Sequence, residues 1–143
     1  MRPKASLLTS IILAFIFLPS VLIAGDFDGK WIAKVNKSTS ACKNIGVEFN
    51  DHYVVLIKQE EGNTITATVE STGNVFHGFR QAANLNLIHL MGSFLKDAGI
   101  VTQYFDLQMS DSNSGSGGSV WTWSNGMYNC GGSYNFTLER ARD

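Results

Sequence analysis

Three histidines are the side chains of this sequence best suited to chemistry near neutral pH: His52, His77 and His89. His77 alternates in step with Val75 and Phe79, and His89 alternates with the apolar residues of the stretch NLNLIHLM. In extended strands such spacing predicts that both histidines face inward. Two imidazoles there could bind the polar group of a ligand, or a metal ion if a third donor were present. The simpler interpretation is two hydrogen-bonded histidines near the mouth of a cavity, and we predict no metal site.

Aromatic residues give a stronger indication of binding. Trp121 and Trp123 are two positions apart, which places them on one face of a short strand. Small-molecule sites are mostly apolar with a few polar groups, so a cavity could be lined by Trp121, Trp123, Phe79, Phe105, Tyr134 and Phe136 together with His77 and His89. Two alternatives stay open. A small interior can be filled completely by its own side chains, and outward-facing tryptophans would form an exposed platform for a sugar or a protein.

Sequence signatures of catalysis are missing. The chain has no G-x-S-x-G, H-E-x-x-H or phosphate-loop pattern. The adjacent pair Glu60 and Glu61 falls in a predicted turn, where solvation is more plausible than acid–base work. We therefore expect neither an enzyme nor a bound cofactor.

The charge balance excludes several partners. Lysine and arginine number 11 against 12 acidic residues, for a net charge of −1, and the charges are spread singly along the chain. Nucleic-acid and anionic-membrane binding need a clustered basic surface, which this sequence does not contain. The partner that we expect is the small apolar ligand indicated by the aromatic residues.

The N-terminus predicts export. Arg2 and Lys4 precede a long apolar run that ends in small residues, which is typical of a secretory signal peptide over residues 1–24, cleaved after Ala24 or Gly25. The alternative, an uncleaved anchor, is disfavoured by Pro19 and by the small residues at the junction. We expect residues 25–143 to form one exported domain, periplasmic or extracellular, with no integral membrane segment.

An oxidising compartment gives the two cysteines a simple role. Cys42 and Cys130 allow one pairing, so a disulfide is expected. Closing so long a loop stabilises the folded chain by about 4 kcal/mol in the chain-entropy model.

The rest of the sequence alternates as β-strands do. In residues 27–36, Phe27, Trp31, Ala33 and Val35 alternate with polar residues. The segment Glu60–Gly62 predicts a three-residue hairpin loop, which would set Ile57 opposite Ile65 and Val55 opposite Ala67. Val101, Phe105, Leu107 and Met109 share a face. The Gly/Ser-rich residues 110–119 predict a flexible loop.

About eight short strands in one domain favour a sandwich or an up-and-down barrel. If the first strand pairs antiparallel with the last, Cys42 falls beside Cys130. Inward faces then match in three pairs: Trp31 with Arg140, Ala33 with Leu138, and Val35 with Phe136. The predicted fold is all-β: a small antiparallel up-and-down β-barrel of about eight strands, closed first-to-last and pinned by one disulfide.

Gly29-Lys30-Trp31 on the first strand and Arg140 on the last resemble the calycin superfamily, which includes lipocalins, fatty-acid-binding proteins and avidins. The stretch VTQYFD is weakly similar to the lipocalin Thr-Asp-Tyr motif, with Gln103 at the acidic position. The resemblance, to an exported bacterial lipocalin-like domain, implies that Arg140 lies across Trp31 at the closed end. Gly29, Trp31 and Arg140 would then be structural.

A transmembrane barrel is a weaker alternative, because the faces opposite the apolar ones carry Thr, Lys, Glu and Asn. The primary expectation is a barrel that holds a small apolar or amphipathic ligand. The alternative is a cell-envelope interaction or inhibitor module that acts through its loops, notably residues 110–119, with no internal ligand.

Overall fold

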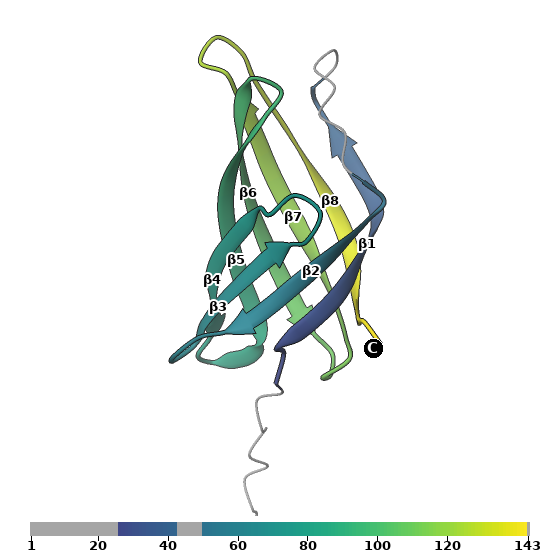
Figure 1. The fold of residues 1–143 in the computed structure, drawn as a ribbon. Helices are drawn as coiled ribbons and strands as arrows, with labels where there is room; N and C mark the ends of the chain where they lie inside the picture. Colours follow the sequence, from purple (N-terminus) through teal and green to yellow (C-terminus); the bar gives the residue numbers. More distant parts are fainter. Residues whose placement is uncertain (1–25, 43–49, 143) are drawn as a thin grey trace, which may run out of the picture.

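The computed structural model describes residues 26–42 and 50–142, which form a closed antiparallel barrel (Figure 1). Neighbours in the chain are neighbours in the barrel, so the topology is up-and-down. This confirms the predicted fold class. The strands are β1 (Gly29–Ser40), β2 (His52–Gln59), β3 (Thr64–Val69), β4 (Val75–Gln81), β5 (Asn84–Lys96), β6 (Gly99–Met109), β7 (Ser114–Ser124) and β8 (Asn129–Arg140).

Closure occurs between β1 and β8 in the predicted register. Trp31 pairs with Arg140, Ala33 with Leu138 and Val35 with Phe136. Alternation fixes this register, because a shift of one residue would turn every apolar side chain to solvent. Beyond Val35 the ladder shifts by a β-bulge between Val35 and Lys37, which the alternation had not indicated.

The disulfide joins the far ends of the two closing strands. Cys42 and Cys130 are bonded, with a Cα–Cα distance of 5.2 Å and a sequence separation of 88 residues. This confirms the expected pairing, and a disulfide of this kind is typical of an oxidising compartment outside the cytoplasm. No helix in the described ranges is long and apolar enough to cross a membrane.

The barrel wall has unequal height. β2, β3 and β4 contain 8, 6 and 7 residues, whereas the other five strands contain 11 to 13. In Figure 1 the long strands continue past the ends of the short ones. One side of the barrel is therefore lower than the other at the end that carries the β1–β2, β3–β4 and β5–β6 connections.

The opposite end is closed by packed side chains. Phe27, Trp31, Ile57, Ile65 and Ile88 are buried there, each at most 2% exposed. Two arginines cover them: the guanidinium carbon of Arg140 lies 4.7 Å from the ring centroid of Trp31, and that of Arg80 lies 4.7 Å from the ring centroid of Phe27. This end of the barrel is therefore a filled plug, and Gly29, Trp31 and Arg140 all belong to it.

The β2–β3 hairpin differs from the predicted register. Ile57 pairs with Ala67 and Val55 with Val69, two residues later than expected. The turn lies one residue further along, because the amide of Glu60 bonds to the carbonyl of Thr64 and Gly62 takes a φ of 70°. A shift by two residues preserves the faces, so the apolar pairing survives.

The Gly/Ser-rich segment is mostly strand, which corrects the prediction of a flexible loop over residues 110–119. β7 begins at Ser114 and pairs with both β6 and β8 through Gly115, Gly117 and Gly118. A Cβ on Gly117 would lie 2.4 Å from the carbonyl oxygen of Asp106. Glycine is required there by close packing of neighbouring strands, and deleting residues 110–119 would open the barrel.

Candidate functional site

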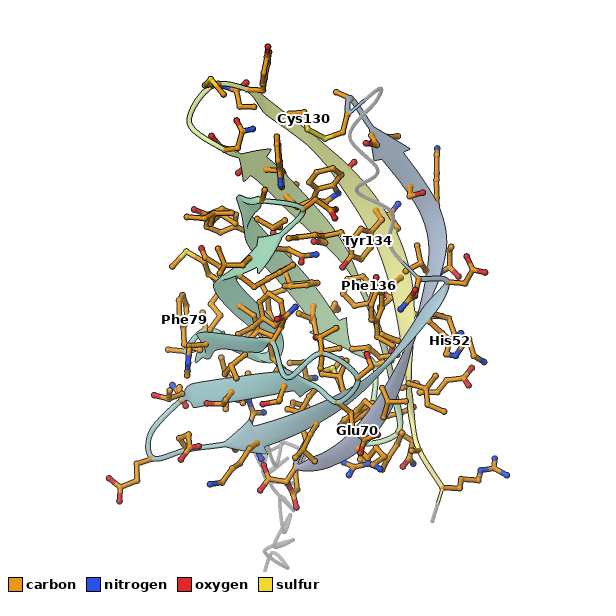
Figure 2. The ribbon with its side chains drawn as sticks, turned by 45° about the horizontal axis from the view of Figure 1, so that its top comes forward. His52, Glu70, Phe79, Cys130, Tyr134 and Phe136 are labelled. Carbon is orange, nitrogen blue, oxygen red and sulfur yellow. A yellow bond between two sulfur atoms is a disulfide. The ribbon has the colours of Figure 1, made fainter. Side chains whose placement is uncertain are left out.

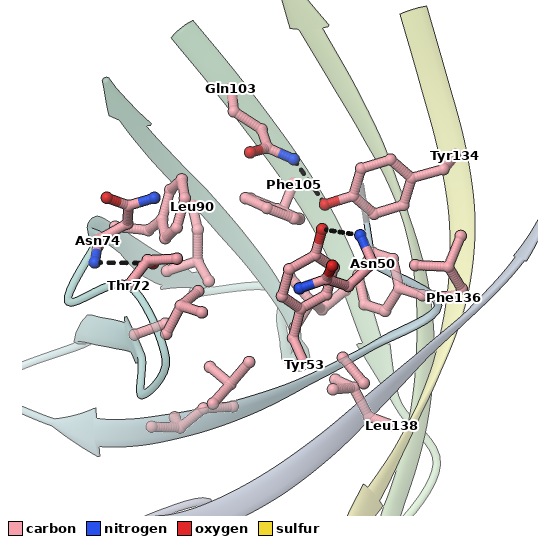
Figure 3. Close-up of a pocket in the computed structure, with 18 of the residues that line it drawn as sticks. Asn50, Tyr53, Thr72, Asn74, Leu90, Gln103, Phe105, Tyr134, Phe136 and Leu138 are labelled. Atoms are coloured by element: carbon pink, nitrogen blue, oxygen red, sulfur yellow. Dashed lines mark hydrogen bonds between the residues drawn. The ribbon is translucent and has the colours of Figure 1, made fainter. Parts of the chain in front are cut away.

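An apolar cavity of about 160 Å³ lies inside the barrel, above the plug (Figure 3). Ala33 and Ala67 follow Trp31 and Ile65 on the same inner faces, and their small side chains leave space where larger ones would fill the interior. Most of the wall is aliphatic or aromatic. The apolar lining consists of Ala33, Val35, Val55, Ile57, Ala67, Val69, Phe76, Leu90, Phe94, Phe105, Leu107, Phe136 and Leu138.

Phenylalanine rings from three separate strands meet in this wall. The ring of Phe105 lies 4.9 Å from that of Phe76 and 6.0 Å from that of Phe136, in both cases edge to face. Such contacts are favourable beyond the area that they bury and hold the rings in fixed orientations. The cavity wall is therefore preorganised.

A buried polar cluster interrupts the apolar wall. Gln103, 2% exposed, donates from Nε2 to Ser119 Oγ at 2.8 Å. It also donates from Nε2 to the hydroxyl of Tyr134 at 2.6 Å (Figure 3). Burial raises the pKa of the Tyr134 phenol, so it stays protonated. A neutral cluster of this kind can orient the polar group of a ligand without placing a charge in the interior.

The mouth of the cavity is more polar than its floor. Tyr53 accepts a hydrogen bond at its hydroxyl from the amide of Asn50, at 2.8 Å, and burial raises its pKa. The other polar lining residues are Thr72 and Asn74, in the turn between the short strands β3 and β4, and Lys96, at the end of β5. An amphipathic molecule could thus place its apolar part inside and its polar part at this rim.

Only some of the candidate residues predicted from sequence line the cavity. Phe105 and Tyr134 line the cavity, as does Phe136. Trp121 and Trp123 face inward and are buried, but they do not contribute to the lining. They pack on the taller part of the wall, where Trp123 Nε1 donates to the carbonyl of Lys96 at 2.7 Å and its ring lies directly over Gly99.

His77, Phe79 and His89 are on the outside, which corrects the expectation that they face the interior. Figure 2 shows Phe79 pointing away from the barrel, whereas Tyr134 and Phe136 point into it. His89 Nδ1 lies 2.6 Å from Asp106 Oδ1 on the outer surface.

His77 and Phe79 face outward because the positions between them and beside them on β4 carry the inward side chains. Phe76 and Arg80 are buried, and Gly78 lies against the backbone of β5. Arg80 is accommodated because Nε donates to the carbonyl of Leu85 and Nη1 to Gln59 Oε1, in addition to the contact with Phe27. Desolvation lowers its pKa.

Several lining residues were not singled out from sequence. Tyr53 alternates with Val55 and Ile57, and this signal could have revealed it. Phe76, Leu90 and Phe94 belong to strands that are apolar on both faces, where alternation does not choose a side. No three His, Cys, Asp or Glu residues in the described ranges are grouped so that they could hold a metal ion.

Comparison with known proteins gives no independent assignment. No protein-family model matches the chain, and no curated protein or solved structure matches it either. The geometry of the cavity is therefore the evidence from which a function must be argued.

Proposed function

We propose that this protein is an exported lipocalin-like barrel that binds a small apolar or amphipathic molecule, and that it acts by binding rather than by catalysis. The observation that carries the proposal is the cavity between the plug and the end of the barrel where β2, β3 and β4 are short. Its wall is largely apolar, its few polar groups cluster around Gln103 and the mouth, and such a composition is typical of small-molecule sites.

The volume limits the size of the buried part of the ligand. Drug-sized molecules occupy pockets of about 300–1,000 Å³, whereas an engineered apolar cavity of about 150 Å³ binds benzene. At about 160 Å³ the present cavity matches the second case. We therefore expect it to hold a single ring or a short alkyl segment, with any larger portion of the ligand extending past Asn74 and Lys96.

The side chain of Gln103 favours a ligand that carries a polar group. Its side-chain hydrogen bonds to described residues are donated by Nε2. The carbonyl Oε1 is then available to accept from a hydroxyl or an amine in the cavity. A ring that carries a short alcohol suits this arrangement better than a hydrocarbon does.

Neighbouring positions on β2 provide a matched test. Val55 lines the cavity, whereas Leu56 is on the outer surface and 50% exposed. We expect toluene, benzyl alcohol and 1-octanol to bind saturably in calorimetric titrations. Val55→Phe should weaken binding at least tenfold by filling the cavity, and Leu56→Phe should leave it unchanged. Flat titrations with all three probes, or equal effects of both variants, would contradict the proposal.

Gln103→Met tests the polar contact. Toluene and benzyl alcohol differ by one hydroxyl, and a neutral hydrogen bond contributes about 0.5–1.5 kcal/mol, or about 2- to 13-fold in affinity. The variant should lose that factor for benzyl alcohol and retain toluene binding. Equal losses for both probes would show that Gln103 shapes the cavity without recognising the hydroxyl.

A further inference from the structure

Positive and negative charges are divided between the two faces of the barrel wall. The strands contain two acidic residues, Asp106 and Glu139, and both form ion pairs on the outer surface. The inward-facing positions of the described strands therefore carry no carboxylate. The charged residues at those positions are all cations: Arg80, Lys96 and Arg140.

Two of these cations are in the plug, and neither is paired with a carboxylate of the described chain. Arg140 donates to backbone carbonyls, and Arg80 donates to one backbone carbonyl and to Gln59 Oε1. Arg80 Nη2 is buried without a hydrogen-bond partner among the described residues. The carboxylates of Asp26 and Asp28 are at the same end of the barrel but exposed to solvent. Because exposed charges are screened more strongly than buried ones, we expect a positive potential in the interior.

Lys96 is the cation at the mouth of the cavity. It is the last residue of β5, the long strand next to the short β4, and it is half-buried. Its side chain is on the same face as Leu90 and Phe94, and all three line the cavity. Three outward lysines form ion pairs, whereas Lys96 forms none with another described residue. Its ammonium group is therefore available to an anion at the rim.

The β3–β4 turn provides a second donor beside this end of β5. A Cβ on Gly92 would lie 2.7 Å from the carbonyl oxygen of Val75, so the residues just before Val75 lie next to the last residues of β5. Asn74 is one of them and lines the cavity (Figure 3). Its side-chain amide donates to no other described residue. An ammonium and an amide at one rim can both donate to a carboxylate, which accepts several hydrogen bonds.

We propose that this rim selects anionic amphiphiles, in which an apolar part fills the cavity and a carboxylate pairs with Lys96. The inference rests on the proposed function of the cavity and adds the chemical class of the polar group. A carboxylate that leaves water needs a compensating charge. Lys96 provides that charge at the rim, where solvent still reaches both groups and desolvation costs little. The ligand class is therefore a small carboxylic acid with a single ring or a short alkyl chain.

Other polar groups fit this rim less well. A cationic amphiphile would approach three inward cations with no inward carboxylate to offset them. A neutral amphiphile is not repelled, but it leaves the ammonium group of Lys96 without an anion. The experiment must therefore separate an anionic ligand from a neutral one of similar length.

Octanoate and 1-octanol provide this comparison, because they have similar alkyl chains and differ in charge. In calorimetric titrations at low salt and neutral pH, octanoate should bind about three- to tenfold more tightly, as expected for one half-exposed ion pair. High salt should lower this ratio of affinities by screening the pair. Lys96→Met should lower the ratio by about the same factor. Lys58→Met, on the outer surface of β2, changes the net charge equally and should leave the ratio unchanged.

Charge reversal at the rim provides a second measurement: Lys96→Glu should bind octylammonium more tightly than octanoate. The proposal would be overturned by a ratio that Lys96→Met does not change, or that Lys58→Met lowers equally. Octanoate that binds no more tightly than 1-octanol would overturn it while leaving the function of the cavity intact. If neither probe bound the native chain, the function of the cavity and this inference would fail together.

Discussion

Arg140 lies across Trp31 and connects three segments of the chain at the closed end of the barrel. Its Nε donates to the carbonyl of Ser112 in the β6–β7 turn, while Nη1 and Nη2 donate to the carbonyls of Asp28 and Asp26. The guanidinium therefore satisfies three backbone acceptors while its face covers the indole. A planar group with donors in several directions is required for both contacts at once.

Arg140→Lys should lower the free energy of unfolding by about 1–3 kcal/mol, because an ammonium group cannot reproduce the fork of hydrogen bonds or the stacking. Urea unfolding at neutral pH measures the change, and Arg142→Lys, exposed just beyond β8, is the control. Ligand affinity should not change, since neither Arg140 nor Trp31 lines the cavity. If both variants were destabilised to a similar extent, the hydrogen bonds and stacking of Arg140 would not be the cause.

Closure of the barrel could be predicted because the sequence contains a long-range constraint. Cys42 and Cys130 place the end of β1 beside the start of β8, and the alternation of both strands then excludes registers shifted by one residue. Within the β2–β3 hairpin the faces were predictable but the turn was not. Gly62 could occupy more than one position in the hairpin loop, and each position gives a different register, which only the tertiary fold selects.

The orientation of β4 and β5 could not be predicted for a physical reason. Alternation identifies a buried face only when the other face is polar, and here the outward face of both strands also carries large apolar residues such as Phe79 and Met91. On β4 the inward face carries Arg80, a residue that alternation assigns to solvent. Its burial depends on Phe27, Leu85 and Gln59, which are distant in the sequence or separated by a turn.

The cavity itself is a property of packing across the barrel. Alternation indicated that Phe105 and Tyr134 face inward, and they do line the cavity. Trp121 also faces inward, but it packs against Gly132 on the taller wall and does not line the cavity. Whether inward side chains meet or leave space depends on the relative heights of residues on opposite strands, which a single sequence does not specify.

Adjacent glycines of β7 should respond differently to alanine. A Cβ on Gly117 would lie 2.4 Å from the Asp106 carbonyl oxygen and 2.8 Å from Phe136 Cζ, so Gly117→Ala should destabilise the fold by about 1–3 kcal/mol. At Gly118 the nearest atom is Asn135 Oδ1 at 3.4 Å, so Gly118→Ala should be neutral or stabilise by up to about 1 kcal/mol. Thermal unfolding distinguishes the two. Identical, small effects would indicate the flexible loop that the composition suggests.

Tyr134 should make the barrel sensitive to alkaline pH. Its side chain is 7% exposed, and burial raises its pKa above the ordinary value of 10.0. A phenol whose pKa is higher in the folded state stabilises that state fully below pH 10. The contribution is lost as the pH rises above 10, because the unfolded chain releases the proton first. The loss should approach about 1.4 kcal/mol per pH unit.

Tyr134→Phe isolates this effect from other groups that titrate at high pH. The difference in free energy of unfolding between the native chain and the variant should be constant from pH 7 to 9 and should decrease above pH 10, because the variant has no phenol to ionise there. Urea unfolding at pH 8, 9, 10 and 11 measures both proteins. Parallel profiles for the native chain and Tyr134→Phe would show that the phenol ionises without opening the barrel, and would contradict its burial as the cause.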